Sequence, residues 1–252
     1  MQPFFTILTP TYNRLHTLVR PLESLVLQTF KDFEWLVIDD GSTDGTEGWF
    51  RAIEGLYDFP IRYYKCQHRG KHISINRGTI LAKGILTGVL DSDDELTSDA
   101  LDRINYNWLR LGTMSKRICG IGGLTYGAEL FPATPYDAYP SDVIFKYKGE
   151  RWGVTRTDLM RQYPLPDVAG DFVPEGLQDL QMSGKYKRRY VNEVFRVYHD
   201  SEDSLTKNKN NSKPGLLYYY KWIWRHMWRY APKAPLKFAK AAVMIPWLIL
   251  SS

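Results

Sequence analysis

Three clusters of polar residues that could do chemistry follow short apolar runs in the first hundred residues. They lie at residues 9–14, 39–46 and 91–94, and together they hold at least four carboxylates with few obvious basic partners. Like charges gathered in one cleft raise each other's pKa, and a divalent cation removes that repulsion. Carboxylate oxygens are hard ligands that suit Mg²⁺ or Mn²⁺, which also bind substrate phosphates.

The third cluster has the most informative spacing. Asp91 and Asp93 are two residues apart at the end of an apolar run, so both carboxylates can face one side, because side chains alternate along a strand. One can bind a metal while the other holds a ribose or a metal-bound water. The alternative for any single cluster is that Asp and Gly merely form turns and caps. Three clusters in order favour a metal and nucleotide site.

The elements that must position these clusters alternate in type along the first half. Strands are expected at residues 4–9, 34–38, 61–64 and 84–90, and helices at 17–28, 43–53, 71–83 and 98–109. The helix at 43–53 is expected to be capped by Ser42 or Thr43. This alternation predicts βαβ units and a largely parallel sheet, whose ligands bind at the carboxyl ends of the strands.

The second half is less regular, and its elements are expected at wider spacing. They are a strand at 118–125, a loop at 130–141, helices at 152–161 and 174–183, a strand at 189–197 and a linker at 207–214. The sequence therefore predicts one domain at 1–206, made of a regular half at 1–110 and a less regular half at 111–206. Residues 207–252 form a basic, aromatic helical tail.

The ordered motifs resemble glycosyltransferase family 2, including its bacterial surface-polysaccharide members. They are Thr9-Pro-Thr-Tyr-Asn-Arg, Val37-Ile-Asp-Asp-Gly-Ser-Thr-Asp-Gly-Thr, Asn76-Arg-Gly and Leu90-Asp-Ser-Asp-Asp. The resemblance covers residues 4–110 strongly and 111–206 more weakly. It implies that residues 1–206 are a catalytic domain, with a nucleotide-sugar-binding half at 1–110 and an acceptor-binding half at 111–206. It implies a GT-A fold, which is α/β and Rossmann-like with a mainly parallel sheet flanked by helices. It also implies a UDP-sugar or another nucleoside-diphosphate sugar as donor, Mn²⁺ or Mg²⁺, inversion at the anomeric carbon and hexosyl transfer (EC 2.4).

The resemblance also implies roles for single residues. Pro10, Tyr12 and Arg14 line the nucleotide pocket, and Asp40 forms a hydrogen bond to the nucleotide base, usually uracil. Lys71 lies near the nucleotide. Asp91 faces the ribose or the metal's water ligands, and Asp93 ligates the metal. For Lys71 the alternative of a solvated helix start stays open, and Asp94 is expected to cap the next segment.

An inverting transfer needs a carboxylate base opposite the leaving diphosphate. The family usually supplies it from a Glu-Asp pair at a helix start after the Asp-x-Asp motif, and this chain has no such pair there. The lone Glu175 after Phe-Val-Pro is the predicted base, with Asp171 and Asp179 as alternates. A helix N-terminus there favours the ionised carboxylate. His199 is the predicted second metal ligand, although a structural role is the alternative. Trp152 is expected in the core rather than against a sugar.

Composition bounds the class of protein, and charge divides the chain. It has 252 residues, 44% apolar and 24% charged, which excludes disordered, collagenous and disulfide-stapled chains. Nine Lys/Arg and no Asp/Glu follow Asp203, so the tail carries +9, whereas residues 1–203 carry −4. With its Trp and Tyr residues, the tail predicts contact with an anionic membrane surface. Packing on the body is the alternative, and no nucleic-acid partner is expected.

The expected location is cytoplasmic and peripheral on the cytoplasmic face of the membrane. The first residues lack a basic leader region, and the longest apolar run, 241–250, is too short to span a bilayer. The expected partners are a sugar nucleotide and a saccharide or lipid-linked acceptor.

Three rival functions remain. One is a catalytically silent sugar-nucleotide-binding protein, and another is a membrane adaptor that acts through the tail. The third is a nucleotidyltransferase, but this class needs a Gly-rich basic loop at the position of residues 10–14.

Overall fold

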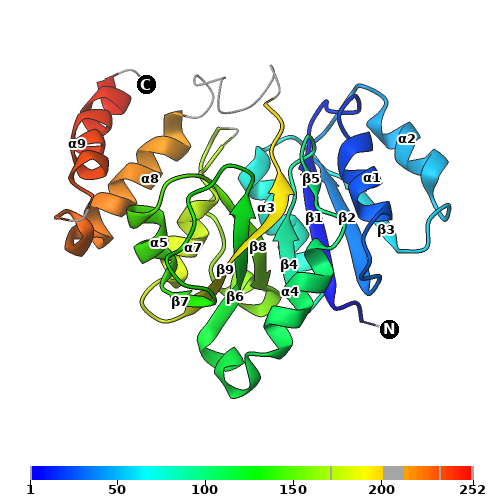
Figure 1. The fold of residues 1–252 in the computed structure, drawn as a ribbon. Coiled ribbons are helices and arrows are strands. Elements are labelled where there is room, and N and C mark those ends of the chain that lie inside the picture. The colour runs from blue at the N-terminus through cyan, green and yellow to red at the C-terminus, as the bar shows by residue number, and fades with distance from the viewer. Residues whose placement is uncertain (1, 171, 201–212, 233, 251–252) are drawn as a thin grey trace.

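The computed structural model describes residues 2–170, 172–200, 213–232 and 234–250. In these residues, a single sheet of nine strands runs through the molecule with helices on both faces (Figure 1). Strand β1 (Phe5–Thr11) is buried throughout because its side chains alternate between two cores. Phe5 and Ile7 join one apolar cluster, and Leu8 joins the other.

The first half forms the parallel part of the sheet, in the order β3-β2-β1-β4. Its other strands are β2 (Phe33–Asp39), β3 (Ile61–Lys65) and β4 (Leu86–Val89). The helices are α1 (Val19–Val26), α2 (Thr46–Ile53), α3 (Lys71–Leu81) and α4 (Ala100–Leu109). All eight elements lie within the expected segments or extend them by one or two residues, so the clusters do follow the carboxyl ends of β1, β2 and β4.

One predicted cap is wrong. Helix α2 begins at Thr46 rather than at residue 43. Asp44 supplies the capping oxygen, because its Oδ1 accepts the Thr46 backbone N–H at 3.2 Å and the Thr46 hydroxyl at 2.6 Å. Ser42 and Thr43 are used instead by the loop after β1.

Beyond β4 the sheet continues with mostly antiparallel strands, in the order β8-β6-β9-β5, with β7 beside β9. The second half supplies β6 (Ile118–Thr125), β7 (Tyr136–Ala138), β8 (Arg151–Arg156) and β9 (Lys187–Val197), and the first half supplies the two-residue β5 (Glu95–Leu96). β6 and β9 are parallel to each other. The sheet is therefore parallel from β3 to β4 and mixed beyond β4.

Two predictions for the second half are wrong. The expected helix at 152–161 is instead β8, followed by the short α6 (Thr157–Gln162). β8 is a strand because it pairs with both β4 and β6, a tertiary constraint that outweighs its local pattern. The expected loop at 130–141 contains β7 and the start of α5 (Pro140–Lys146). A 3₁₀ turn occupies Gly112–Arg117, and α7 (Gly176–Met182) lies within its predicted segment.

The tail folds into α8 (Lys213–His226), a 3₁₀ turn (Trp228–Tyr230) and α9 (Pro235–Leu250), at the opposite end of the molecule from α1 and α2 (Figure 1). Ile223, Met227 and Phe238 pack with Phe145 and Leu180 of the body. The packing expected as the alternative therefore exists on the inner side. Most of the predicted linker, 207–212, lies outside the described residues, and the division at 206 stays a prediction. No helix in the described segments is long and apolar enough to cross a membrane.

Candidate active site

The loops after β1 and β2 are tied to each other by side chains. Asn13 has a positive φ of 51°, and its side-chain oxygen accepts the Thr43 backbone N–H at 2.8 Å. Its own N–H donates to the Ser42 hydroxyl at 2.8 Å, and Ser42 N–H donates to Asp39 Oδ1 at 2.7 Å. Polar residues of the first two clusters thus satisfy loop backbone groups and hold both loops at one sheet edge.

Asp40 organises the start of α3. Its carboxylate is buried and accepts the backbone N–H groups of Arg69 at 3.0 Å and Gly70 at 2.7 Å. The His68 ring lies 2.8 Å from the same carboxylate through Nδ1 and stacks on Tyr12, with ring centroids 4.2 Å apart. Asp40 is predicted to bond the nucleotide base. In the structure, its carboxylate already holds the backbone that forms the pocket wall. Sequence reasoning missed His68, since the residue has no metal-ligand spacing and its stacking partner is far along the chain.

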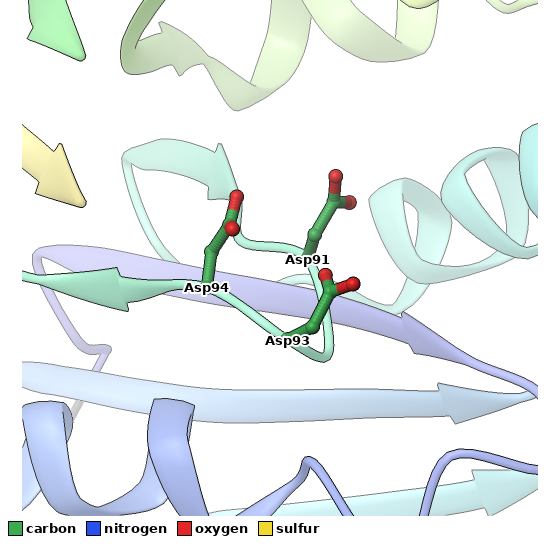
Figure 2. Close-up of side chains that lie close together, drawn as sticks. All are labelled: Asp91, Asp93 and Asp94. Atoms are coloured by element: carbon green, nitrogen blue, oxygen red, sulfur yellow. The ribbon is translucent and has the colours of Figure 1, made fainter. Parts of the chain in front are cut away.

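The turn after β4 gathers three carboxylates. Asp91, Asp93 and Asp94 place ligand oxygens within 4.8 Å of one another (Figure 2). Asp93 is paired with Arg14, with 3.0 Å between Oδ2 and Nη1. A hard-oxygen set of this size fits Mn²⁺ or Mg²⁺.

Asp94 differs from its two neighbours in its surroundings. It is fully buried, accepts the His199 backbone N–H at 3.1 Å and lies 3.1 Å from the Arg196 guanidinium. Burial raises the pKa of Asp94 to about 7, because the attraction of Arg196 offsets only part of the desolvation. Asp94 thus connects the turn to the end of β9 instead of capping the segment that follows it, so the predicted cap is wrong.

Lys71 joins the acidic turn to the predicted base. Its Nζ lies 2.6 Å from Asp91 Oδ1 and 2.7 Å from Glu175 Oε1. Burial alone would raise the pKa of Asp91, but Lys71 holds it below its usual value. Burial raises the pKa of Glu175, and Lys71 lowers it only in part. The two carboxylates, 84 residues apart in sequence, therefore share one ammonium group.

Glu175 stands at the start of α7, where the Leu177 N–H donates to the Pro174 carbonyl at 3.0 Å. The alternate base Asp179 is paired with Arg188 at 2.7 Å, and burial raises the pKa of its carboxyl. Asp171, the other alternate, lies outside the described residues. Glu175 is thus paired with the lysine of the donor half, whereas Asp179 is paired with an arginine of β9.

A cavity of about 1240 Å³ brings the predicted residues together. It is lined by Pro10, Tyr12, Arg14, Asp40, Lys71, Asp91, Asp93 and Glu175. His199 is not among the residues that line it, and its Nε2 lies 2.8 Å from Glu95 Oε1. The metal-ligand role of His199 stays a prediction. Trp152 is buried in the core, as expected, although an edge of it reaches the cavity.

The expectation of few basic partners at this sheet edge is wrong. Arg14, Lys71 and Arg196 each pair with a carboxylate of the acidic turn. Arg196 comes from β9, about a hundred residues from its partner, so sequence reasoning had no local signal for it. The edge is electrostatically matched rather than strongly acidic.

The comparison with family models agrees with this geometry. Residues 6–112 match the model of Glycosyl transferase family 2. Over these residues the chain is similar to that family. The match covers β1 to β4 and the loops that follow them at the cavity, so the resemblance inferred from the motifs is confirmed there.

The curated relatives are bacterial proteins that are named as glycosyltransferases or polysaccharide synthases. A GalNAc(5)-diNAcBac-PP-undecaprenol beta-1,3-glucosyltransferase of Campylobacter jejuni is 27% identical over 224 residues, 81% of this chain and 67% of its own length. The putative teichuronic acid biosynthesis glycosyltransferase TuaG of Bacillus subtilis is 26% identical over 55% of this chain and 52% of its own length. Hyaluronan synthase of Pasteurella multocida is 32% identical over 86% of this chain, which spans only 24% of that protein.

Solved structures support the fold. Staphylococcus aureus TarS 1–349 in complex with UDP-GlcNAc aligns with 97% of this chain and 71% of its own, at a TM-score of 0.67 and 16% identity. The mannosyltransferase PcManGT of Pyrobaculum calidifontis, in complex with GDP-Man and Mn²⁺, aligns with 99% of this chain and 74% of its own, at 0.69 and 17%. The predicted GT-A class with a helical C-terminal extension is confirmed.

Proposed function

We propose that this protein is a metal-assisted, inverting glycosyltransferase. It transfers a sugar from a nucleoside-diphosphate sugar, with UDP-sugar as the preferred class, to a hydroxyl of a saccharide or lipid-linked acceptor. The observation that carries the proposal is the cavity in which Lys71 pairs both with Asp91 in the turn after β4 and with Glu175 at the start of α7. The match to the family model and the nucleotide-sugar complexes of the structural neighbours support it.

The donor end of the cavity has parts for each piece of a nucleotide sugar. The exposed Tyr12 ring, backed by His68, is a stacking surface for a base, and Asp40 sets the adjoining wall. Asp93 would hold Mn²⁺ or Mg²⁺, with Asp91 toward the ribose or the metal's waters. Bound there, the metal would neutralise the charge that develops on the leaving diphosphate.

Glu175 is the proposed general base. The acceptor oxygen forms a bond to the anomeric carbon while the bond from that carbon to the diphosphate oxygen breaks, and the acceptor proton passes to Glu175. A single displacement inverts the configuration at that carbon. For this step Lys71 must release Glu175, and the anionic diphosphate is the group that competes for the lysine.

Calorimetry tests the donor and metal sites directly. UDP, GDP and CMP are titrated with and without Mn²⁺ into the wild type and Asp93→Asn. We expect Mn²⁺-dependent binding of UDP that Asp93→Asn weakens by roughly tenfold to a hundredfold, the loss typical of a disturbed metal site. Asp158→Asn is the control, because Asp158 pairs with Arg156 away from the cavity lining. Absence of nucleotide binding by the folded wild type would reject the proposal.

A silent sugar-nucleotide-binding protein is the second candidate. The pairing of Lys71 with Glu175 favours it, because the ammonium 2.7 Å from Oε1 engages one of the two oxygens with which Glu175 could accept a proton. Measurement of UDP-sugar hydrolysis and of transfer to saccharide acceptors separates the two. Nucleotide binding without either turnover would favour the silent protein.

The proposal includes partners beyond the donor. The acceptor is a saccharide or a lipid-linked glycan, and the Campylobacter relative is named for a glycan linked to PP-undecaprenol. An anionic membrane surface at the cytoplasmic face is the proposed partner of residues 207–252, supported by the +9 charge of the tail.

A further inference from the structure

Helix α9 has an inner face that is buried against the rest of the protein. Phe238, Ala241 and Leu248 are at most 5% exposed, and Ala234 in the preceding turn is 9% exposed. Their spacing of three, four and seven residues places them on one side of the helix. This face, together with α8, anchors the helix through the cluster that contains Phe145.

The outer face of α9 is also apolar. Leu236 is 84% exposed, Val243 69%, Trp247 50% and Leu250 87%. These residues recur every three, four or seven positions, with Lys240 completing the same stripe. A helix that packs on a globular protein normally has polar residues on its outer face. The apolar outer face of α9 is therefore suited to contact with another apolar surface.

The charge of the surrounding tail indicates what covers it. The chain after Asp203 contains Lys and Arg but no Asp or Glu. On the α8 side, exposed basic and Trp side chains alternate: Lys221, Trp224, Arg225, Trp228 and Arg229. Exposed Trp beside Lys and Arg, next to an apolar helix face, is the pattern of helices that lie in the interface of an anionic bilayer. A protein partner would need a large acidic and apolar surface instead.

The same helices border the active site. Tyr219 of α8 and Lys237 of α9 line the cavity that contains Glu175. Gly215 fixes the position of α8, because a Cβ there would lie 2.0 Å from the Phe172 carbonyl oxygen. A surface bound through the outer face of α9 would therefore lie next to the acceptor side of the cavity.

We infer that the outer stripe of α9, defined here as Leu236, Lys240, Val243, Trp247 and Leu250, docks the protein on an anionic lipid surface. The stripe lies in the headgroup region while the basic residues of α8 contact lipid phosphates. Docking in this way places the cavity beside the bilayer and selects the lipid-linked class of acceptor over free saccharides. The acceptor part of this inference rests on the proposed function, whereas the docking part does not.

Sedimentation with vesicles tests the docking. The full chain is mixed with vesicles of phosphatidylcholine alone or of equal parts phosphatidylcholine and phosphatidylglycerol. We expect binding to the mixed vesicles only, weakened by added salt. Val243→Glu is expected to weaken binding by roughly tenfold or more, because it removes apolar burial and adds repulsion. Leu56→Glu is the matched control, since Leu56 is equally exposed at 69% but lies between α2 and β3.

Three outcomes would overturn the inference. One is failure of the wild type to bind the mixed vesicles, and another is an equal loss of binding in Leu56→Glu. The third is a concentration-dependent dimer, seen by sedimentation velocity, that Val243→Glu dissociates without changing vesicle binding; a second copy would then cover the stripe. UDP titration of Val243→Glu separates the two proposals. Vesicle binding without nucleotide binding would reject the proposed function and leave the docking intact.

Discussion

The sheet edge that borders the cavity and the tail at residues 207–252 differ in how their charged residues are balanced. At the sheet edge Arg14, Lys71 and Arg196 each have a carboxylate partner, and Asp40 is held by two backbone N–H groups. The tail has basic residues and no acidic residue of its own. Matched charges keep the site folded and let a charged donor exchange partners within it. A segment that contains basic residues but no acidic residue depends on groups outside itself for neutralisation, so the tail is suited to an anionic surface.

The largest effect is expected from Glu175→Gln. It should lower kcat by roughly a hundredfold to ten-thousandfold, because a carboxamide cannot accept the acceptor proton. UDP affinity and vesicle binding should stay near wild type, since the amide keeps the shape of the side chain. Glu129→Gln, away from the cavity lining, is the control. Transfer kinetics and calorimetry check this, and an unchanged kcat would assign the base elsewhere, with Asp179 as the next candidate.

Lys71→Met should change the pH dependence of transfer. Lys71 lowers the pKa of Glu175, so its removal raises that pKa further. The base works only when ionised; a higher pKa therefore leaves less of it ionised at a given pH, and the acid limb of kcat/KM moves to higher pH. We also expect UDP affinity to fall by roughly tenfold through loss of a charge-assisted contact with the diphosphate.

The pH profile of Lys71→Met is compared with that of Lys83→Met. Lys83 is exposed just beyond the other end of α3, so its removal should leave the acid limb in place. Lys71→Arg should bring the acid limb part of the way back toward its wild-type pH. An acid limb at the wild-type pH in Lys71→Met would show that Lys71 does not act on the base.

The smallest effect is expected from His68→Ala. Loss of the ring behind Tyr12 should weaken UDP binding by roughly tenfold, the order of one aromatic stacking contact. Vesicle binding should not change. His226→Ala in α8 is the control, since its ring stacks on Trp222 in the tail. Equal nucleotide affinity in His68→Ala would mean that Tyr12 needs no support to bind a base.

The sequence predicted the helices and strands of residues 1–110 well, because the hydrophobic pattern of each segment there agrees with its position in the sheet or on its faces. Buried parallel strands are continuous apolar runs, and amphipathic helices separate them, so the ends of β1, β2 and β4 could be placed to within about two residues. It failed at β8, where Trp152 and Val154 are buried between β4 and β6 although the segment resembles a helix. The two-residue β5 and the strand β7 are too short to leave a sequence pattern.

The sequence identified the polar residues of the candidate site, but it did not indicate which of them form ion pairs with one another. Asp91, Asp93 and Glu175 stand out by spacing and position, yet nothing local indicates that Lys71 lies between Asp91 and Glu175. Likewise the charge of the tail is visible in the sequence, whereas the exposure of Val243 and Trp247 depends on which side of α9 meets the body.

The sequence by itself determined the resemblance to glycosyltransferase family 2, the alternation of strands and helices in the first half, the carboxylates at the strand ends and the division of charge. These follow from periodicity and composition, which act over a few residues. Only the tertiary structure decided which cations neutralise those carboxylates, that α7 brings Glu175 to the donor half, and which face of α9 remains exposed. Ion pairing and burial depend on distance in space, and the fold brings together residues about a hundred positions apart.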